Sequence, residues 1–318
     1  MQESEEITLC LPGIPMAALD DATQWRVLFK FSQELLSIVA GEHGLKCVAT
    51  RDIAARQVIL VEHPVATFDI NPYGQGAQFM ARPDVQALQQ TIMRCSAANA
   101  GREGTDAYPA EAREAIEGIM ALSATVELAS RDAATVDRVF ALEDSFRKAI
   151  AGEHVCVDGL ASAAGKLLNG RRGVVRRVED DGRRRVRLLG GAAGETLKAI
   201  KRENLKSIGG IIRTNSFEDE NRAKLFETLC RFNHACGATA NVTKVFEHLV
   251  TGNGARCAHV TTLRDIRRGE ELCIDYIIGS NEASLDTAPR RAYLQMKYNF
   301  VCQCSKCMRS PPVKATCV

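Results

Sequence analysis

Three cysteines near the end of the chain constrain the fold most. Cys302, Cys304 and Cys307 follow a C-x-C-x-x-C spacing, in which the thiols cannot easily pair with one another as disulfides. Three such thiolates can converge on one zinc ion, which prefers four ligands in a tetrahedron. A fourth ligand must then come from a remote segment, and Cys236 is the candidate. Cys317 is an alternative ligand, but it lies beyond a pair of prolines and we interpret it as a free tail thiol.

The remaining cysteines favour a reducing compartment. Most of the 12 cysteines stand singly in apolar context, as do Cys47, Cys156, Cys230 and Cys273. The acidic start of the chain, Met1 to Glu6, is unlike a secretory signal or an Arg-rich transit peptide. We therefore expect buried thiols and one zinc cluster in an intracellular protein of the nucleus or cytoplasm.

Length and composition limit the classes of protein to which this chain can belong. With 318 residues, the chain is long enough for one large domain with an insert or for two domains. Apolar residues make up 46% of the chain, which is ample for a core, and charged residues 25%. A net charge of +2 gives the chain as a whole no electrostatic preference for nucleic acid or membrane, and no apolar run is long enough to span a bilayer.

Three motifs follow one another in an order that resembles a known family. They are Asn233-His234-Ala-Cys236, then Gly269-Glu-Glu-Leu with Tyr276 four residues later, then Phe300-Val-Cys302-Gln-Cys304-Ser-Lys-Cys307. They resemble N-H-S-C-x-P-N, G-E-E-L-x-x-x-Y and F-x-C-x-C-x-x-C of the SET domain of protein-lysine methyltransferases and its post-SET zinc cluster. Asn215-Ser216-Phe217 resembles the N-S-F segment that precedes the N-H motif in SET-and-MYND-like proteins. Residues 71–154 carry no paired C-x-x-C set, so we expect no MYND finger.

An earlier segment fits the opening strands of the same family. The family pattern G-x-G-L-x-A-T-R-D-I begins at Gly44, and its second glycine falls on Lys46, a departure that crowds the cofactor loop. The family's Pro and Asn after the N-H motif fall on Ala238 and Thr239, with Asn241 as a substitute for the missing Asn. The resemblance covers residues 41–70 and 208–308.

The resemblance implies transfer of a methyl group from S-adenosylmethionine to a protein lysine. A free lysine has a pKa of about 10.4, so an enclosed channel must favour the neutral amine by desolvation. In the family a tyrosine hydroxyl sits beside the transferred methyl, and Tyr276 occupies that position; the alternative is a tyrosine packed at a core edge. The implied cofactor contacts are Gly44, Lys46, Asn215, Asn233, His234 and Phe300. Three roles are open for Phe300: its ring stacks near the adenine, lines the lysine channel, or only packs in the core.

The expected fold is mainly β with α inserts: a SET-domain β-clip fold with an inserted helical segment, a small Tudor- or KOW-like barrel and a C-terminal zinc segment. We expect helices over residues 25–39, 84–94, 110–128, 135–150 and 221–231. The expected divisions are an N-terminal helical segment at 1–40, the first SET half at 41–70, a helical insert at 71–154, the barrel at 155–207, the second SET half at 208–280 and the post-SET segment at 281–318.

The barrel segment is strongly basic. Val174, Val175 and Val178 precede an Asp181-Gly182 turn, which predicts a hairpin within about five short strands. Between Lys166 and Lys206 there are thirteen basic and five acidic residues, a local charge of +8. This face is either simply solvated or contacts nucleic acid or an acidic protein. No aromatic side chains are interleaved for base stacking.

Three functions therefore remain open. The first is a protein-lysine methyltransferase acting on a histone or another protein that presents a lysine. The second is a catalytically weak SET protein that works as a binding or scaffold module through its basic barrel. Lys46 and the altered segment after Cys236 motivate the second function. The third is a nucleic-acid-binding regulator that only keeps the SET frame.

Overall fold

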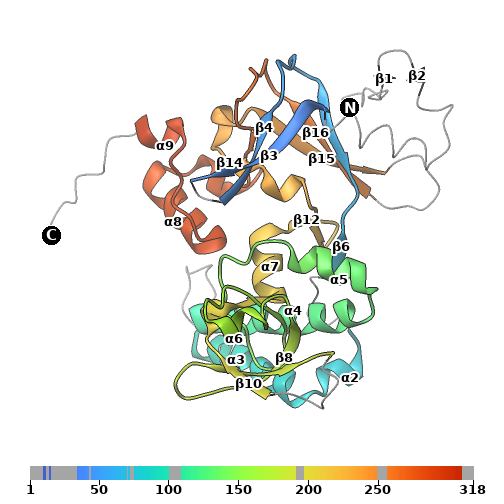
Figure 1. Cartoon of the computed structure of the whole chain (residues 1–318). Coiled ribbons are helices and arrows are strands. Elements are labelled where there is room, and N and C mark those ends of the chain that lie inside the picture. The colour runs from blue at the N-terminus through green and yellow to red at the C-terminus, as the bar shows by residue number, and fades with distance from the viewer. Residues whose placement is uncertain are drawn as a thin grey trace. The chain divides into compact units, whose positions relative to one another are not determined.

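The computed structural model describes residues 10–11, 14–15, 34–42, 44–69, 71, 75–99, 109–190, 197–248 and 256–309 (Figure 1). The chain forms two units, each built from separate stretches of sequence. The first unit comprises Met1–His63, Arg231–Arg290 and Cys302–Val318. The second comprises Pro64–Cys230 and Arg291–Val301.

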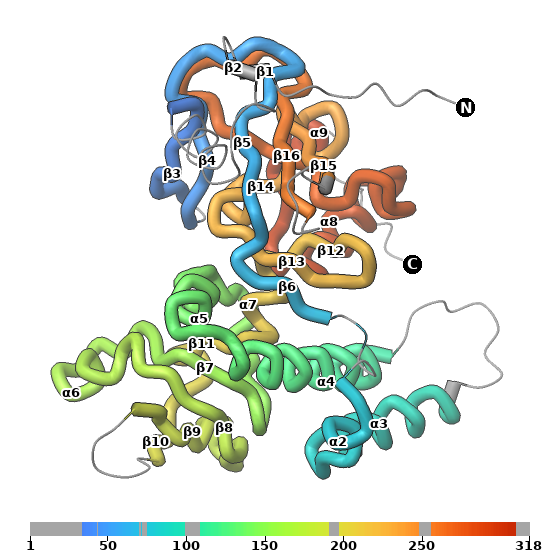
Figure 2. Tube along the Cα trace, turned by 90° about the vertical axis from the view of Figure 1, so that its right-hand side faces the viewer, coloured from blue at the N-terminus to red at the C-terminus, as the bar shows by residue number. Residues whose placement is uncertain are grey.

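Short strands make up most of the first unit. β3 (Leu36–Gly41) and β4 (Gly44–Ala49) form an antiparallel hairpin. Figure 2 shows β5 (Val58–Glu62), β16 (Arg256–Thr262) and β15 (Val242–His248) side by side in an antiparallel sheet, with β16 in the centre. The apolar run of β5 suits this half-buried sheet. β1 (Cys10–Leu11) pairs with β2 (Ile14–Pro15).

One parallel pair sets the geometry of the candidate site. β14 (Asn233–His234) pairs with β17 (Cys273–Ile274), so that Asn233 lies beside Cys273 and His234 beside Ile274. Short helical turns follow: η4 (Gly237–Thr239), η5 (Asn281–Ser284) and α9 (Ser305–Arg309). α8 (Thr287–Tyr298) has residues in both units.

Helices form one part of the second unit. They are α2 (Ala77–Met80), α3 (Pro83–Asn99), α4 (Ala110–Ala129), α5 (Ala133–Phe140) and α7 (Ile208–Asn215). A sheet of β12 (Phe217–Asp219), β13 (Arg222–Leu225) and β6 (Ala66–Asp69) adjoins them. Leu128, Ile208 and Ile211 from α4 and α7 pack with Phe68 and Leu225 from this sheet in one core.

The other part is the sheet predicted from the basic segment. It consists of β7 (His154–Val157), β8 (Arg172–Val178), β9 (Arg184–Leu188), β10 (Leu197–Ile200) and β11 (Leu205–Ser207) in the order β10-β9-β8-β7-β11. The short turns α6 (Ala163–Lys166) and η2 (Arg202–Asn204) connect its strands. The five strands and the turn at Gly182, with φ of 79°, are as predicted. Val155, Val175 and Val186 lie in its core.

Three predicted helices are wrong in part or whole. Residues 36–39 belong to β3, because Ile38 and Val39 pair with Cys47 and Lys46; residues 25–33 lie outside the described part. The helix predicted over 135–150 ends at Phe140. Beyond it, the carboxylate of Asp144 binds the N–H groups of two following residues. The helix predicted over 221–231 is replaced by β13 and η3 (Leu229–Arg231).

Ten cysteines of the described residues, those from Cys47 to Cys307, are free thiols. Among the described helices, none combines the length and the apolar character needed to cross a membrane.

Candidate functional site

Four cysteines from remote parts of the chain converge in the first unit. Sγ of Cys236 lies 3.7 Å from Sγ of Cys302 and 3.6 Å from Sγ of Cys307. The four sulfurs of Cys236, Cys302, Cys304 and Cys307 all lie within 4.8 Å of one another. A tetrahedral zinc ion with Zn–S bonds of about 2.3 Å places its sulfurs roughly 3.8 Å apart. The cluster therefore fits such an ion. Cys317 lies outside the described residues.

The contact between the sulfurs of Cys236 and Cys302 shifts the pKa values of the two thiols in opposite directions. A hydrogen bond from the Cys302 thiol, assisted by one from His234, lowers the pKa of Cys236 to about 3. The same contact raises the pKa of Cys302, because its proton is held between the two sulfurs. Cys236 is therefore predisposed to be a thiolate, the form in which cysteine binds metals.

His234 connects this cluster to Tyr276. The backbone N–H of Tyr276 donates to Nδ1 of His234 at 3.0 Å, so Nδ1 carries no proton. In the neutral ring the proton then lies on Nε2, which is 3.1 Å from Sγ of Cys236 and donates to it. The imidazole is 1% exposed. Such a contact orients a metal-binding thiolate and tunes its basicity.

Arg290 places a positive charge against the same sulfurs. Its Nη2 lies 3.5 Å from Sγ of Cys307, and the residue is 2% exposed. A zinc ion with four thiolates would carry a net charge of about −2. Because buried charge needs compensation, Arg290 offsets part of this excess.

Tyr276 follows β17, and its side chain points back to the strand β14. Its hydroxyl donates to the carbonyl oxygen of Phe232 at 2.8 Å. Its ring centroid lies 5.2 Å from that of His234. The parallel pairing of β14 with β17 thus brings the predicted Tyr276, Asn233 and His234 together. The carbonyl of Phe232 was not singled out in the sequence, since any residue carries such a group.

Lys46, Glu271 and Asn233 form a polar chain. Nζ of Lys46 lies 3.2 Å from Oε2 of Glu271, and Nδ2 of Asn233 donates to Oε1 of Glu271 at 2.7 Å. A Cβ on Gly41 would lie 3.0 Å from Cδ of Lys46, so this glycine makes room for the lysine stem. Sequence reasoning missed Glu271, although it is the second glutamate of the G-E-E-L motif.

Gly44 and Asn241 occupy contrasting positions. Gly44 has φ of 111°, and among the described residues no heavy atom lies within 4 Å of the place a Cβ would take. Asn241 is 3% exposed; its Nδ2 donates to the carbonyl of Glu271 at 2.8 Å, and its Oδ1 accepts from the N–H of Cys273 at 2.7 Å. Gly44 borders open space, whereas Asn241 fixes the segment before β17.

Asn215 and Phe300 belong to the second unit. Nδ2 of Asn215, at the end of α7, donates to the carbonyl oxygens of Glu143 and Ile211, both at 2.7 Å. The half-buried ring of Phe300 lies 6.4 Å from that of Tyr298. Their roles at a cofactor remain predictions.

In the basic sheet of the second unit, acidic side chains pair with several of the arginines. Oε1 of Glu179 accepts from Nε of Arg177 at 3.1 Å and from Nε of Arg185 at 2.8 Å. Arg183 pairs with Asp181 at 3.3 Å. These exposed pairs neutralise part of the hairpin and are worth little energy. Contact with nucleic acid or an acidic protein stays a prediction.

Comparisons with known proteins give a family match. A model described as SET domain matches residues 44–277. "Histone-lysine N-methyltransferase ATXR4" of Arabidopsis thaliana is 28% identical over 123 residues, which are 39% of this chain and 31% of the relative. "SET domain-containing protein SmydA-8, isoform A" of Drosophila melanogaster is 33% identical over 122 residues, 35% of this chain and 23% of the relative. The match thus spans less than a third of each relative.

A solved structure was also found. It is described as the SET domain of LSMT bound to lysine and AdoHcy, is 10% identical, and superposes with a TM-score of 0.34 over 87% of this chain and 56% of that chain.

Proposed function

The chain belongs to the SET domain family, and on that premise we propose that it is an S-adenosylmethionine-dependent protein-lysine N-methyltransferase. The observation that carries the proposal is the Tyr276 hydroxyl hydrogen-bonded to the carbonyl of Phe232, beside Asn233 and His234. Three of the residues expected at the reaction centre come from remote segments and meet through one parallel strand pair.

The Tyr276 hydroxyl has a defined role in this proposal. Its proton is directed to the carbonyl of Phe232, so the lone pairs of its oxygen face away from that bond. They can accept a hydrogen bond from a substrate amine and hold its lone pair in line for attack. Such alignment, rather than acid or base strength, supplies most of the rate in a direct displacement.

The proposed cofactor contacts in the first unit are Gly44, Lys46, Asn233 and His234. Asn215 and Phe300, which belong to the second unit, stay predicted contacts. S-adenosylmethionine, when bound, supplies the electrophilic methyl group. The open space beside Gly44 allows close approach of a ligand to the backbone. The Lys46 ammonium, half-buried and held by Glu271, is suited to attract the cofactor's carboxylate.

We propose zinc as the ion of the four-cysteine cluster. The sulfur spacing and the Arg290 charge beside it support this choice. The metal would hold the segment Cys302–Cys307 against Cys236 and hence against His234 and Tyr276. Its function in this proposal is structural, because all four positions of a tetrahedral ion are taken by sulfur.

The test combines binding and turnover. Calorimetry of zinc-loaded protein should show saturable binding of S-adenosylmethionine that Asn233→Ala weakens roughly tenfold or more, since it leaves a polar group unpaired. Asn281→Ala, an exposed asparagine of η5, is the matched control and should bind as the wild type does. Tyr276→Phe should retain binding but lose about a hundredfold in methyl transfer to a protein panel. Undiminished transfer would remove Tyr276 from the mechanism.

A second candidate function rests on Lys46. Its ammonium occupies the position of a family glycine and is tied to Glu271. If this ion pair closes the cofactor loop, the chain is a catalytically weak SET protein that acts as a binding module. Absence of S-adenosylmethionine binding by folded, zinc-loaded protein would favour this function. Recovery of binding by Lys46→Gly would identify the lysine as the cause.

A further inference from the structure

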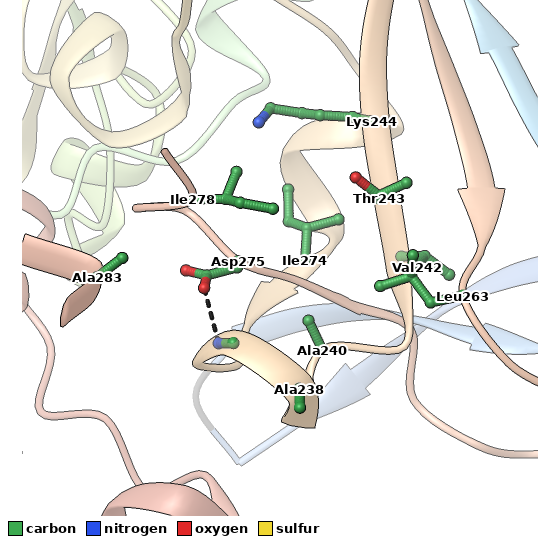
Figure 3. Close-up of a pocket in the computed structure, with 11 residues that line it drawn as sticks. Ala238, Ala240, Val242, Thr243, Lys244, Leu263, Ile274, Asp275, Ile278 and Ala283 are labelled. Carbon is green, nitrogen blue, oxygen red and sulfur yellow. Dashed lines mark hydrogen bonds between the residues drawn. The ribbon is translucent and has the colours of Figure 1, made fainter. Parts of the chain in front are cut away.

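The first unit contains a pocket of about 380 Å³ that the proposed reaction does not use. Figure 3 shows Val242, Thr243 and Lys244 of β15 on one side, with Asp275 and Ile278 opposite. Ala283 of η5 lies beyond them. Its volume falls within the range of pockets that bind small ligands or side chains.

The pocket adjoins the candidate reaction centre. Ile274, Asp275 and Ile278, which line the pocket, flank Tyr276 in the chain, and Gly237, another lining residue, directly follows Cys236. Oδ1 of Asp275 lies 3.8 Å from Nδ1 of His234, the atom that accepts the Tyr276 N–H. The segment that carries Tyr276 therefore also supplies part of the pocket wall.

The walls are mostly aliphatic, and two of these side chains are exposed. Ile278 is 63% exposed and Leu263 is 51% exposed. Beside them, β15 is one of the two edge strands of its three-stranded sheet in the described part of the chain. An edge strand can pair with an extended peptide, and neighbouring pockets then select its side chains. This combination suits an extended chain that carries an aliphatic side chain.

The pocket carries one basic and one acidic side chain, Lys244 and Asp275. Both carboxylate oxygens of Asp275 are engaged: Oδ2 accepts from the N–H of Gly237 at 2.7 Å, and Oδ1 from that of Ile277 at 3.1 Å. The Lys244 ammonium lies 6.0 Å from the centre of the Phe246 ring. Burial lowers the pKa of Lys244, and the negative charge of Asp275 acts on it in the opposite direction. The two charges therefore offset one another, and the aliphatic walls decide which side chain the pocket accepts.

We infer that this pocket receives an aliphatic side chain of the protein substrate, from a residue within a few positions of the target lysine. The inference rests on the proposed methyltransferase function and specifies its substrate class. An extended chain advances about 3.3 Å per residue, so a flanking residue two or three positions away reaches past the Tyr276 segment.

The test uses short lysine-centred peptides in which one flanking position at a time is leucine, glutamate or arginine. In methyl-transfer assays, leucine at one flanking position should raise kcat/KM over arginine about tenfold or more, the value expected for burying a leucine side chain. Ala283→Trp fills the pocket and should reduce this preference to about twofold or less. Ser284→Trp, its exposed neighbour in η5, is the matched control and should keep the preference.

A second measurement separates this inference from the proposed function. In NMR spectra of protein labelled at isoleucine methyl groups, the leucine peptide should shift Ile274 and Ile278, and Ala283→Trp should abolish the shifts. Shifts without methyl transfer would retain the pocket and refute the methyltransferase. Methyl transfer with no flanking preference, or with a preference that Ala283→Trp leaves unchanged, would refute the pocket. Neither shifts nor transfer would refute both.

Discussion

The ammonium of Lys46 lies 3.2 Å from Oε2 of Glu271, although the two residues are 225 positions apart in the chain. Both side chains are 32% exposed. A partly exposed pair of this kind contributes at most about 1 kcal/mol. Glu271 has a second partner, because its Oε1 accepts from Asn233. The carboxylate is therefore more important to the site than the lysine.

Substitutions should show that Glu271 contributes more to stability than Lys46 does. Lys46→Ala should lower the free energy of unfolding by less than about 1 kcal/mol. Glu271→Ala should lower it by about 1–3 kcal/mol, because it leaves both Lys46 and Asn233 without their acceptor. Urea denaturation of the two single variants and the double variant measures the coupling energy. Equal losses in both single variants would contradict the shared role of Glu271.

Removal of one cluster cysteine should release the metal. Cys236→Ala leaves three thiolates, so zinc measured by mass spectrometry should fall from one ion per chain to well below one. The unfolding free energy should fall by several kcal/mol, since metal binding is coupled to folding. Cys95→Ala, a buried thiol of α3, is the control and should keep its zinc. Full zinc content in Cys236→Ala would place the ion elsewhere.

His234 should set zinc affinity without binding the ion. His234→Ala removes the Nε2–H that donates to Cys236, so affinity should fall about 10- to 100-fold. Competition with a coloured chelator measures this change. His234→Gln keeps an N–H donor and should recover part of the affinity; a loss equal to that of the alanine variant would indicate a packing effect instead.

Glu153 should make stability depend on pH. Burial raises its pKa to about 7, although its carboxylate accepts from the N–H groups of Ile150 at 2.8 Å and Gly209 at 2.7 Å. The unfolded chain ionises this group near pH 4.5, so its contribution to stability is complete below that pH. The unfolding free energy should fall by up to a few kcal/mol as pH rises to about 7, and then level off.

Glu153→Gln isolates this dependence. The variant should be less stable at low pH, because an amide offers only one acceptor to the two N–H groups. Its unfolding free energy should vary less than that of the wild type between pH 4.5 and 7, measured by urea denaturation. A decline as steep as in the wild type would assign the effect to another group.

Gly210 should tolerate no side chain. A Cβ there would lie 2.1 Å from Oδ1 of Asp144, which is 1% exposed and also accepts from the N–H of Ser207 through Oδ2. Gly210→Ala should therefore cost about 3 kcal/mol or more. A Cβ at Gly118 in α4 would meet only side-chain ends, of Leu88 at 3.0 Å and of Ile150 at 3.3 Å, so Gly118→Ala should change stability by less than about 1 kcal/mol. Thermal unfolding distinguishes the two; equal shifts would contradict the role of Asp144.

Local patterns predicted several elements correctly. The alternating valines around Gly182 predicted the hairpin of β8 and β9, because a short turn and a half-buried strand leave clear local signatures. The helix expected over 221–231 failed for the opposite reason. Ala223 and Leu225 are helix-compatible residues, but they pair with Phe68 and Ala66 of β6, and this remote pairing overrides local preference.

The sequence by itself determined which cysteines would meet, since a C-x-C-x-x-C tail lacks one ligand for a tetrahedral ion and Cys236 stands in the matching motif. Only the tertiary structure decided which residues of the site contact one another. The hydrogen bond that Asn233 donates to Glu271, the proton position on His234 and the pocket beside Asp275 all depend on the parallel pairing of β14 with β17. That pairing joins residues about forty positions apart, and its register has no signature in either strand alone.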